Sequence, residues 1–214
     1  MPGAWEQRQP TVLACVMHAE TTTVAWACSL RKLQPHHMPV VPLAGMPFDH
    51  CRNQMCMLAL EHGFDYLFML DSDVTPPEDC VPRLLAHKLP IVSGVYHRRS
   101  PPEGVPVMMR PLGHWLVNYP KNKLIDVDVV GAGCLLIHRS VLQEFKALAP
   151  GHHWFWWTSD MRGLLPQDHC LSEDFSFCRG AREQGWKVMV DTSIQCGHIG
   201  NAKATRGQFQ PLVA

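Results

Sequence analysis

The segment DYLFMLDSDVTPPED (residues 65–79) joins an apolar run to a cluster of carboxylates. After its first residue, the run at 65–70 is wholly apolar, which is typical of a strand buried at the centre of a sheet. Asp71 and Asp73 follow directly. Two carboxylates so close together repel each other, and both lose hydration if the strand end is buried. Their placement therefore needs a chemical or a structural reason.

A helix start explains the second part of the segment. Thr75, Pro76 and Glu78 predict an N-cap, a first helical position and a capping box, and the helix should run to about His87. With Thr75 as the cap, neither aspartate is needed there. Ligands of open α/β sheets bind at the carboxyl ends of strands, and two hard oxygen ligands suit Mg²⁺ or Mn²⁺ shared with a diphosphate. The structural alternative places one aspartate in a turn and the other near the helix N-terminus.

Strands and helices alternate around this segment. The pattern predicts, in chain order, a strand at 11–19, a helix at 21–34, a strand at 38–43, a helix at 50–62, the strand at 65–70, the helix at 75–87 and a strand at 90–98. Val24 and Cys28 should face the core, and Gly63 should end its helix. Short loops between these βα units predict a mainly parallel sheet with helices on both faces.

The second half of the chain is less regular. Its pattern predicts a Pro- and Gly-rich loop at 100–113, strands in an antiparallel arrangement at 113–120 and 125–139, a helix from Ser140 to about Leu148, an aromatic loop at 151–169, a helix at 171–185 and a last strand at 186–191. A long loop in a compact domain is usually functional or covers a site. The whole pattern predicts one α/β domain.

Composition places the chain among globular proteins. Of its 214 residues, 46% are hydrophobic and 18% are charged, and 19 Lys and Arg balance 19 Asp and Glu. This balance argues against a generally basic surface for nonspecific nucleic-acid binding. No apolar run approaches the roughly 18–20 residues that span a bilayer, and the first ten residues lack a signal-peptide pattern, so a cytoplasmic protein is expected. The nine cysteines form no CxxC pair, which predicts buried, reduced thiols.

Further candidate side chains lie in the last third of the chain. Glu173 and Asp174 follow Ser172 at a helix start, where acidic residues are favoured by the helix dipole and Ser is an ordinary cap. The alternative is a catalytic carboxylate. His198 lies between glycines after the last strand, so it is either a turn residue or a metal ligand.

Three other features have a structural and a functional interpretation. Arg52 is either part of a solvated helix start or a fork that binds a nucleotide or the aspartates. Gly131 and Gly133 would let a substrate approach the backbone. The aromatic cluster is either core or a binding surface, and its members are Trp154, Phe155, Trp156 and Trp157.

The order of these motifs resembles that of the GT-A-fold glycosyltransferases, especially the large inverting family with many phage and bacterial members. Four segments carry the resemblance: CRNQMCMLAL (51–60), FDYLFMLDSDVTPPED (64–79), VVGAGCLLIHRSVL (129–142) and SEDFSFCRGAREQGWKVMVDTSIQCGHIG (172–200). The resemblance implies a Rossmann-like single domain at 1–214, with a nucleotide-sugar-binding half at about 11–100, an acceptor and catalytic half at about 101–200 and a mobile tail at 201–214. The implied ligands are a UDP- or GDP-sugar and a divalent metal, Mn²⁺ or else Mg²⁺.

The resemblance also implies roles for the acidic segment. Asp71, Ser72 and Asp73 correspond to the family's Asp-x-Asp motif. In that motif Asp73 is the more direct metal ligand, Asp71 lies nearer the ribose or a metal-bound water, and Ser72 contacts the donor. His198 corresponds to the residue that completes the metal site.

Catalytic and binding residues follow from the same resemblance. Asp174 corresponds to the general base of an inverting transfer, and Glu173 to the neighbour that positions a sugar. The nucleotide site would contain Met17, His18, Ala19, Glu20 and Arg52. The acceptor and sugar pocket would contain Gly131, Ala132, Gly133, Trp154, Trp156 and Trp157. The first strand lacks the Pro or acidic residue that grips the base in many relatives, which leaves the nucleotide open.

The alternative functions differ in the reaction that the protein would catalyse or in the acceptor that it would use. A nucleotidyltransferase would need a Gly-rich, Arg- or Lys-bearing loop after the first strand, which ETTTVAW (residues 20–26) does not supply. A noncatalytic carbohydrate-binding or scaffold module would keep the fold without the chemistry. The acceptor is a saccharide or lipid-linked glycan, or else a hydroxylated base of modified DNA, along which Arg98 and Arg99 would follow the phosphate backbone. The sequence does not predict the oligomeric state.

Overall fold

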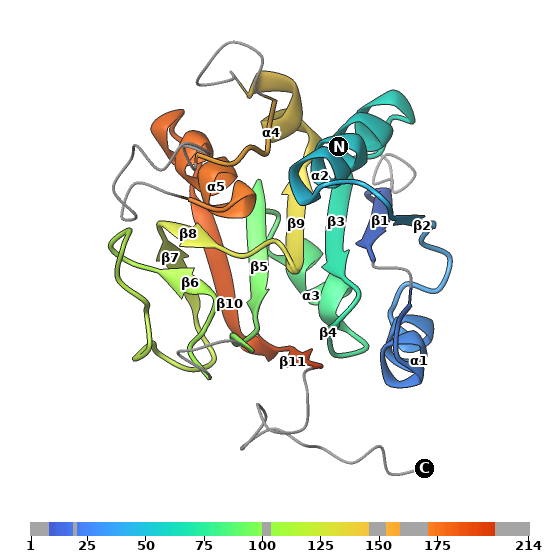
Figure 1. Ribbon diagram of the computed structural model, residues 1–214, viewed down its shortest axis with the longest axis horizontal. Coiled ribbons are helices and arrows are strands. Elements are labelled where there is room, and N and C mark those ends of the chain that lie inside the picture. The colour runs from blue at the N-terminus through green and yellow to red at the C-terminus, as the bar shows by residue number, and fades with distance from the viewer. Residues whose placement is uncertain (1–8, 19–20, 100–103, 146–152, 159–170, 200–214) are drawn as a thin grey trace, which may run out of the picture.

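A seven-stranded sheet forms the centre of the molecule, in the order β2-β1-β3-β9-β5-β10-β7 (Figure 1). The computed structural model describes residues 9–18, 21–99, 104–145, 153–158 and 171–199. The strands of the central sheet are β1 (Val12–Met17), β2 (Val40–Leu43), β3 (Tyr66–Asp71), β5 (Ile91–Val95), β7 (Leu124–Val127), β9 (Cys134–His138) and β10 (Val188–Gln195).

Most strands of this sheet run in one direction. β1 is parallel to β2 and β3, and β5 is parallel to β10. β9 is antiparallel to both β3 and β5, and β7 is antiparallel to β10. Five of the seven strands therefore point the same way, while the reversed strands both come from the second half of the chain. The prediction of a mainly parallel α/β sheet with antiparallel strands in the second half is confirmed.

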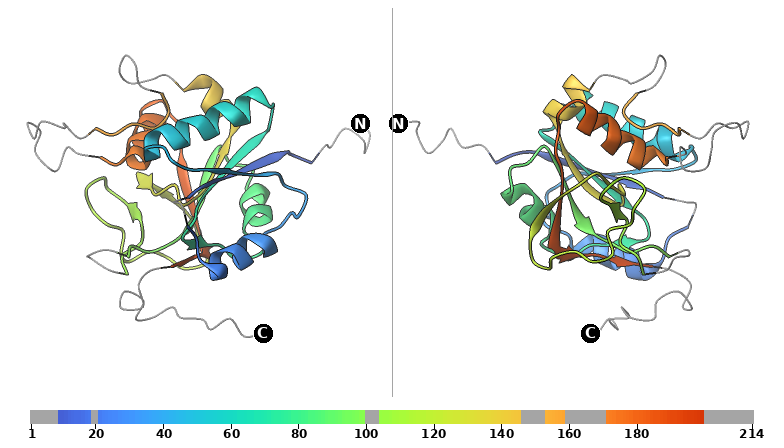
Figure 2. Two further views of the ribbon diagram at one scale, coloured as in Figure 1. Left: turned by 45° about the vertical axis from the view of Figure 1, so that its right-hand side comes forward. Right: turned by 90° about the vertical axis from the view of Figure 1, so that its left-hand side faces the viewer.

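Helices cover both faces of the sheet (Figure 2). They are α1 (Val24–Lys32), α2 (Phe48–Glu61), α3 (Cys80–Ala86), α4 (Arg139–Glu144) and α5 (Glu173–Glu183). One core contains the inward side chains of α2, α4 and α5, and a second core contains those of α1 and α3. Gly63 has a φ of +72° just after α2, a conformation that glycine adopts without strain, and this ends the helix as predicted.

Two small antiparallel sheets extend the strand ends. β4 (Val74–Thr75) pairs with β11 (Gly197–His198), and β6 (Met108–Met109) pairs with β8 (Val129–Val130). The predicted N-cap at Thr75 is therefore wrong, because Thr75 lies in β4 opposite Gly197. α3 begins only at Cys80, after a turn in which the N–H of Cys80 donates to the carbonyl of Pro77.

Other predicted elements differ in extent. Residues 113–120 do not form a strand; Trp115 makes only an isolated bridge to Met109. The predicted strand at 125–139 is divided into β7, β8 and β9, because the chain bends at Asp128 and turns at Gly131–Gly133. Val24 is 80% exposed, and Trp26 faces the core in its place. Within the described residues α4 ends at Glu144, before the predicted Leu148.

Two remaining features of the described residues are the state of the cysteines and the length of the helices. The described cysteines are free thiols, and all of them except Cys28 are buried. Among the described residues, no helix has both the length and the apolar composition needed to cross a membrane.

Candidate active site

Several strand ends meet at one edge of the sheet. β1, β3, β5 and β10 run in the same direction, so their carboxyl ends share this edge. β9 is antiparallel to its neighbours, so the turn at Gly131–Gly133, which precedes it, lies at the same edge. The N–H of Asp71 donates to the carbonyl of Gly133 at 3.2 Å. α5 also begins here, since the N–H of Ala132 donates to Asp174 Oδ2 at 3.3 Å.

Arg52 binds carboxylates from two other elements. Its side chain is on α2 and is 2% exposed. Nε donates to Glu173 Oε1 at 3.0 Å, and Nη2 donates to Asp71 Oδ1 at 3.2 Å. Nη1 reaches the carbonyl of Ala132 at 3.5 Å. Arg52 therefore ties α2, the end of β3 and the start of α5 together, which agrees with the predicted contact to the aspartates and contradicts a solvated helix start.

Burial sets the protonation properties of this group. It raises the pKa of Asp71, and the charge of Arg52 opposes that effect. It also raises the pKa of Glu173, with a further contribution from Asp174 and opposition from Arg52. Burial alone would lower the pKa of Arg52, but the two carboxylates reverse this and raise it. The guanidinium thus opposes the rise in the pKa of both carboxylates.

Asp73 lies in a more open position, beside His198. Asp73 Oδ1 is 3.3 Å from His198 Nε2, and Asp73 Oδ2 is 2.6 Å from Arg99 Nη2. His198 Nδ1 lies 2.6 Å from the carbonyl oxygen of His97, to which it donates in the corresponding tautomer. Burial works to raise the pKa of Asp73, but the hydrogen bond and charge of His198 and the charge of Arg99 outweigh it and lower the pKa.

The donor atoms at Asp73 and His198 fit a divalent metal. His198 Nδ1 is held by a carbonyl and Nε2 lies next to a carboxylate oxygen, which is the usual arrangement of a metal-binding histidine. Asp71 does not join them, because both its carboxylate oxygens face Arg52. Within the described ranges, no three His, Cys, Asp or Glu side chains are grouped closely enough to hold a metal. The structure thus offers two adjacent metal donors where three were predicted, and a bound diphosphate would have to supply further oxygens.

Asp174 lies half-buried at the start of α5. Its Oδ2 accepts from the N–H of Ala132, and its Oδ1 accepts from the hydroxyl of Ser172 and from the N–H of Phe175. Ser172 occupies the N-cap position, but its hydroxyl binds Asp174 and not a backbone N–H, so the predicted side-chain cap is wrong. These bonds hold the carboxylate in one orientation, which a general base requires.

The glycines of the turn make room for a tyrosine. A Cβ at Gly131 would lie 1.9 Å from the Tyr96 hydroxyl, and a Cβ at Gly133 would lie 3.0 Å from the Tyr96 ring and 3.1 Å from Asp71 Oδ2. Gly131, Ala132 and Gly133 are all buried. The prediction that these glycines let a substrate approach is therefore corrected, because the protein's own side chains fill that space.

The predicted nucleotide residues lie at the end of β1. The N–H of Ser72 donates to the carbonyl of Met17 at 3.0 Å, and the N–H of His18 donates to the carbonyl of Leu43. Met17, His18 and Ser72 are therefore brought together at the site edge. Of the remaining predicted contacts, Ala19 and Glu20 lie outside the described residues, and Arg52 binds Glu173 and Asp71.

The tryptophans divide between core and surface. Trp156 is 7% exposed, and Trp154 donates its indole N–H to the carbonyl of Leu142 at 2.8 Å. These two tryptophans are packed against the protein, so their rings are not free to line the predicted acceptor and sugar pocket. Trp157 is 45% exposed and stays a candidate for ligand contact.

The predicted nucleic-acid arginines already have partners. The guanidinium of Arg98 lies over the ring of Trp115, with its Cζ 4.7 Å from the ring centroid. Arg99 binds Asp73 and also donates to the carbonyl of Ile199. Arg110 pairs with Asp126. These interactions reduce the charge that the region could offer to a phosphate backbone.

Sequence reasoning missed the roles of two residues. The Tyr96 hydroxyl accepts from the N–H of Gly133 at 3.1 Å, and burial, together with the charge of Asp71, raises the pKa of Tyr96 well above its usual value. Its signal is a polar aromatic near the carboxyl end of the predicted strand at 90–98. Asn53 accepts from the N–H groups of Trp154 and Phe155 and so anchors the aromatic segment. Nothing local in the sequence indicates that long-range contact.

Comparisons with known proteins bear on the fold. No protein-family model matches the chain, and no curated protein matches its sequence. Among solved structures, A197 from STIV is similar with a TM-score of 0.59 and 18% identity, over 88% of this chain and 86% of that one. A structure of GalNAc-T7 with UDP, GalNAc and Mn²⁺ is similar with a TM-score of 0.54 and 11% identity, over 90% of this chain and 45% of that one. At these identities the likeness shows the fold, which is the mixed α/β arrangement of the GT-A type.

Proposed function

We propose that the protein is a metal-dependent glycosyltransferase that moves a sugar from a nucleotide-sugar donor to an acceptor hydroxyl. The observation that carries the proposal is that Asp73 lies beside His198 and that Asp174, bound by the N–H of Ala132, lies at the same carboxyl edge of the sheet. The solved structure of GalNAc-T7, which has this fold, contains UDP, GalNAc and Mn²⁺. Its ligands supply the chemistry that the proposal assigns to this edge.

The metal would be held by Asp73 and His198, with Mn²⁺ as the first choice and Mg²⁺ as the second. A bound divalent cation stabilises the negative charge that develops on a leaving diphosphate. The protein's own part is to present the two donors side by side and to orient the imidazole through the carbonyl of His97. Arg99 is a further cation at this position, and an incoming metal would displace it from Asp73 Oδ2.

Asp174 would accept the proton of the attacking hydroxyl in an inverting transfer. Its carboxylate is fixed by Ser172 and by two backbone N–H groups, so the direction of proton transfer is set before the acceptor binds. Glu173 does not face the reactants in this scheme. It holds Arg52 and thereby positions Asp71 at the edge of the site.

The nucleotide would lie along the end of β1. Met17, His18 and Ser72 form the described part of that site, and a uridine or guanosine diphosphate is the expected donor. Residues 11–100 would then bind the donor, while the rest of the single domain would provide the base and the acceptor contacts. Trp157, which is 45% exposed, would offer an aromatic face to a saccharide.

The proposal is tested with a panel of UDP- and GDP-sugars in the presence of Mn²⁺. Binding is followed by calorimetry, and donor hydrolysis or transfer by product release. Asp73→Asn should abolish metal-dependent donor binding, whereas Asp174→Asn should keep donor binding and lose transfer by about 10²-fold or more. Glu78→Gln, an exposed carboxylate paired with Lys32, is the matched control and should change neither.

Specific outcomes separate the rival functions. Donor binding without hydrolysis or transfer, unaffected by Asp174→Asn, would favour a noncatalytic carbohydrate-binding module. Turnover of a nucleoside triphosphate and a sugar phosphate would favour a nucleotidyltransferase. If no donor binds and Asp73→Asn changes nothing, the glycosyltransferase proposal is wrong.

A further inference from the structure

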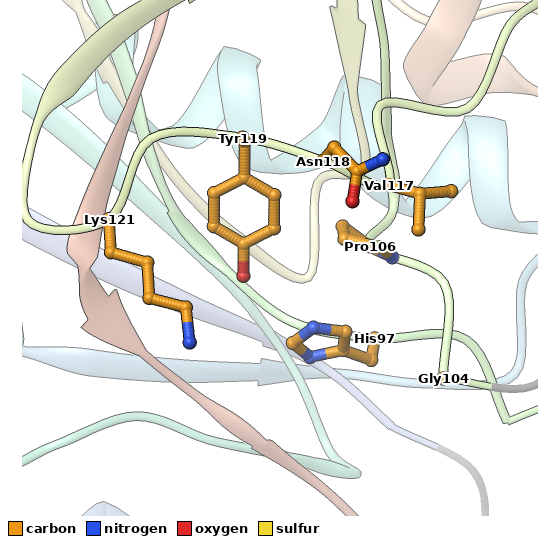
Figure 3. A pocket seen from close by; sticks show the side chains of 7 residues that line it. All are labelled: His97, Gly104, Pro106, Val117, Asn118, Tyr119 and Lys121. Carbon is orange, nitrogen blue, oxygen red and sulfur yellow. The ribbon is translucent and has the colours of Figure 1, made fainter.

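A cavity of about 480 Å³ lies beside the candidate site and has no role in the proposal above (Figure 3). One wall contains His97 and Pro106, which follow β5, and the opposite wall contains Asn118, Tyr119 and Lys121. Figure 3 shows the Tyr119 hydroxyl and the Lys121 ammonium pointing into the same space, with the His97 ring facing them. Polar groups from two distant segments therefore converge on one volume.

The polar groups of this cavity, among its described lining residues, include one cation and no carboxylate. Lys121 supplies one positive charge and three hydrogen-bond donors, and Tyr119 and Asn118 each supply donor and acceptor atoms. His97 Nδ1 is buried and has no hydrogen-bond partner within the described structure. A ligand with one oxyanion and several hydroxyl groups complements such a lining.

The walls of the cavity are held in place by hydrogen bonds to backbone atoms. His97 pairs with Pro106 in an isolated β-bridge, and the N–H of Arg98 donates to the carbonyl of Val105 at 2.8 Å. On the other wall, the carbonyl of Pro120 accepts from the Thr192 hydroxyl at 2.7 Å. A preformed cavity loses less conformational entropy when a ligand binds, so modest contacts suffice for affinity.

The cavity is connected to the candidate site through a single residue. The ring of His97 lines the cavity, while its carbonyl oxygen lies 2.6 Å from His198 Nδ1. His198 in turn lies beside Asp73. A molecule held in the cavity is thus one residue away from the proposed metal donors.

The charge available favours a small ligand over a polymer. A nucleic acid is bound through several cations that each neutralise a phosphate. Here Arg99 is paired with Asp73, and Arg110 is paired with Asp126. Lys121 alone of the described lining residues carries a full positive charge into the cavity.

We propose that this cavity binds a small hydroxylated molecule with one oxyanion group, such as a sugar phosphate. Lys121 binds the oxyanion, and Tyr119 and Asn118 bind hydroxyl groups. To call this molecule the acceptor of glycosyl transfer rests on the proposed function. Its binding in the cavity does not.

The test uses the full chain without metal or nucleotide sugar, so that it does not depend on glycosyl transfer. Inorganic phosphate, glucose 1-phosphate and glucose are titrated separately, and binding is followed by calorimetry and by NMR of the protein. Lys121→Gln should weaken glucose 1-phosphate by about tenfold or more, because a charge-assisted hydrogen bond is lost. Lys123→Gln removes the same charge two residues away, outside the lining, and should change the affinity by less than about twofold.

Each result of these titrations either supports or overturns the proposal. Glucose should bind much more weakly than glucose 1-phosphate, and Tyr119→Phe should weaken the sugar phosphate more than inorganic phosphate. The proposal is overturned if neither anion binds saturably, if glucose binds as well as its phosphate, or if both lysine variants lose affinity equally. Tighter binding of duplex DNA, weakened equally by both variants, would also overturn it. Anion binding that depends on Lys121 supports the inference even where the donor panel fails.

Discussion

Arg52→Met should destabilise the protein strongly, because it leaves two carboxylates without their cation. The substitution keeps much of the side-chain volume but removes the bonds to Asp71 and Glu173. Both Arg52 and Glu173 are almost fully buried, with exposed fractions of 2% and 3%. Removing one partner of a buried ion pair costs about 3–5 kcal/mol, since the remaining charge has neither water nor a counter-ion.

A matched pair on the surface isolates the effect of burial. Arg179 donates to Glu183 at 2.8 Å, a distance similar to the 3.0 Å between Arg52 and Glu173. The side chains of that pair are 50% and 44% exposed. Arg179→Met should therefore cost no more than about 0.5 kcal/mol, as for other exposed pairs one helical turn apart. The free energies of unfolding are measured by urea denaturation, with tryptophan fluorescence as the signal.

The deficit of Arg52→Met should depend on pH in one direction. Burial already raises the pKa values of Asp71 and Glu173, and loss of the guanidinium raises them further. The folded variant then binds more protons than the unfolded chain, so its stability falls as pH rises above about 4, the range of unfolded carboxyl groups. The deficit should be large at about pH 8 and smaller at about pH 5. A cost equal to that of Arg179→Met at pH 8, or a deficit that grows on acidification, would refute this reasoning.

Other perturbations give smaller effects. Arg99→Ala should tighten Mn²⁺ binding by less than about tenfold in calorimetry, because it removes a competing cation whose exposed pair contributes at most about 1 kcal/mol; weaker binding would contradict a competing role. Gly131→Ala should cost about 1–3 kcal/mol in urea denaturation, with partial recovery on adding Tyr96→Phe, because the new Cβ meets the Tyr96 hydroxyl. Asp191→Asn should cost stability at about pH 6 and little below about pH 3. Burial acts to raise the pKa of Asp191, but hydrogen bonds from Ser193 and His87 outweigh it and lower the pKa. The stabilisation by Asp191 is therefore full above the unfolded pKa of about 4 and disappears as pH falls through the lower folded pKa. A cost that persists unchanged at pH 3 would exclude that linkage.

The periodic parts of the fold could be predicted from sequence, because the residues that become buried there form a local pattern of apolar side chains. The apolar run at 65–70 is β3 at the centre of the sheet, and Gly63 ends α2. The prediction failed where a partner far away in sequence decides the structure. Thr75 has the features of an N-cap, yet Gly197 offers it a strand to pair with, and no property of residues 75–78 reveals that partner.

The site shows the same division. The resemblance implied a shared site for Asp73 and His198, which lie 3.3 Å apart, and the helix pattern at 171–185 put Asp174 in the first turn of what is α5. The burial of Arg52 was also readable in principle, since Met55, Cys56 and Ala59 continue its face at helical spacing and are all buried. A charged residue on an apolar stripe needs a buried counter-ion. The filling of the glycine turn by Tyr96, in contrast, depends on how β5 and β9 are placed, which only the folded chain determines.

The two neighbouring aspartates reduce their mutual repulsion by facing different partners. Residues two apart in a straight strand point to the same face, but the chain leaves β3 at Asp71 and turns at Ser72, so the carboxylates separate. Asp71 faces the buried Arg52, and Asp73 faces His198 and Arg99 in a partly exposed position. Their substitutions should therefore differ in kind: Asp71→Asn disturbs a structural ion pair and lowers stability, whereas Asp73→Asn leaves the fold intact and removes an anionic ligand from the site. In the proposed site, the second of these two carboxylates is the one that would exchange its protein cation for a metal.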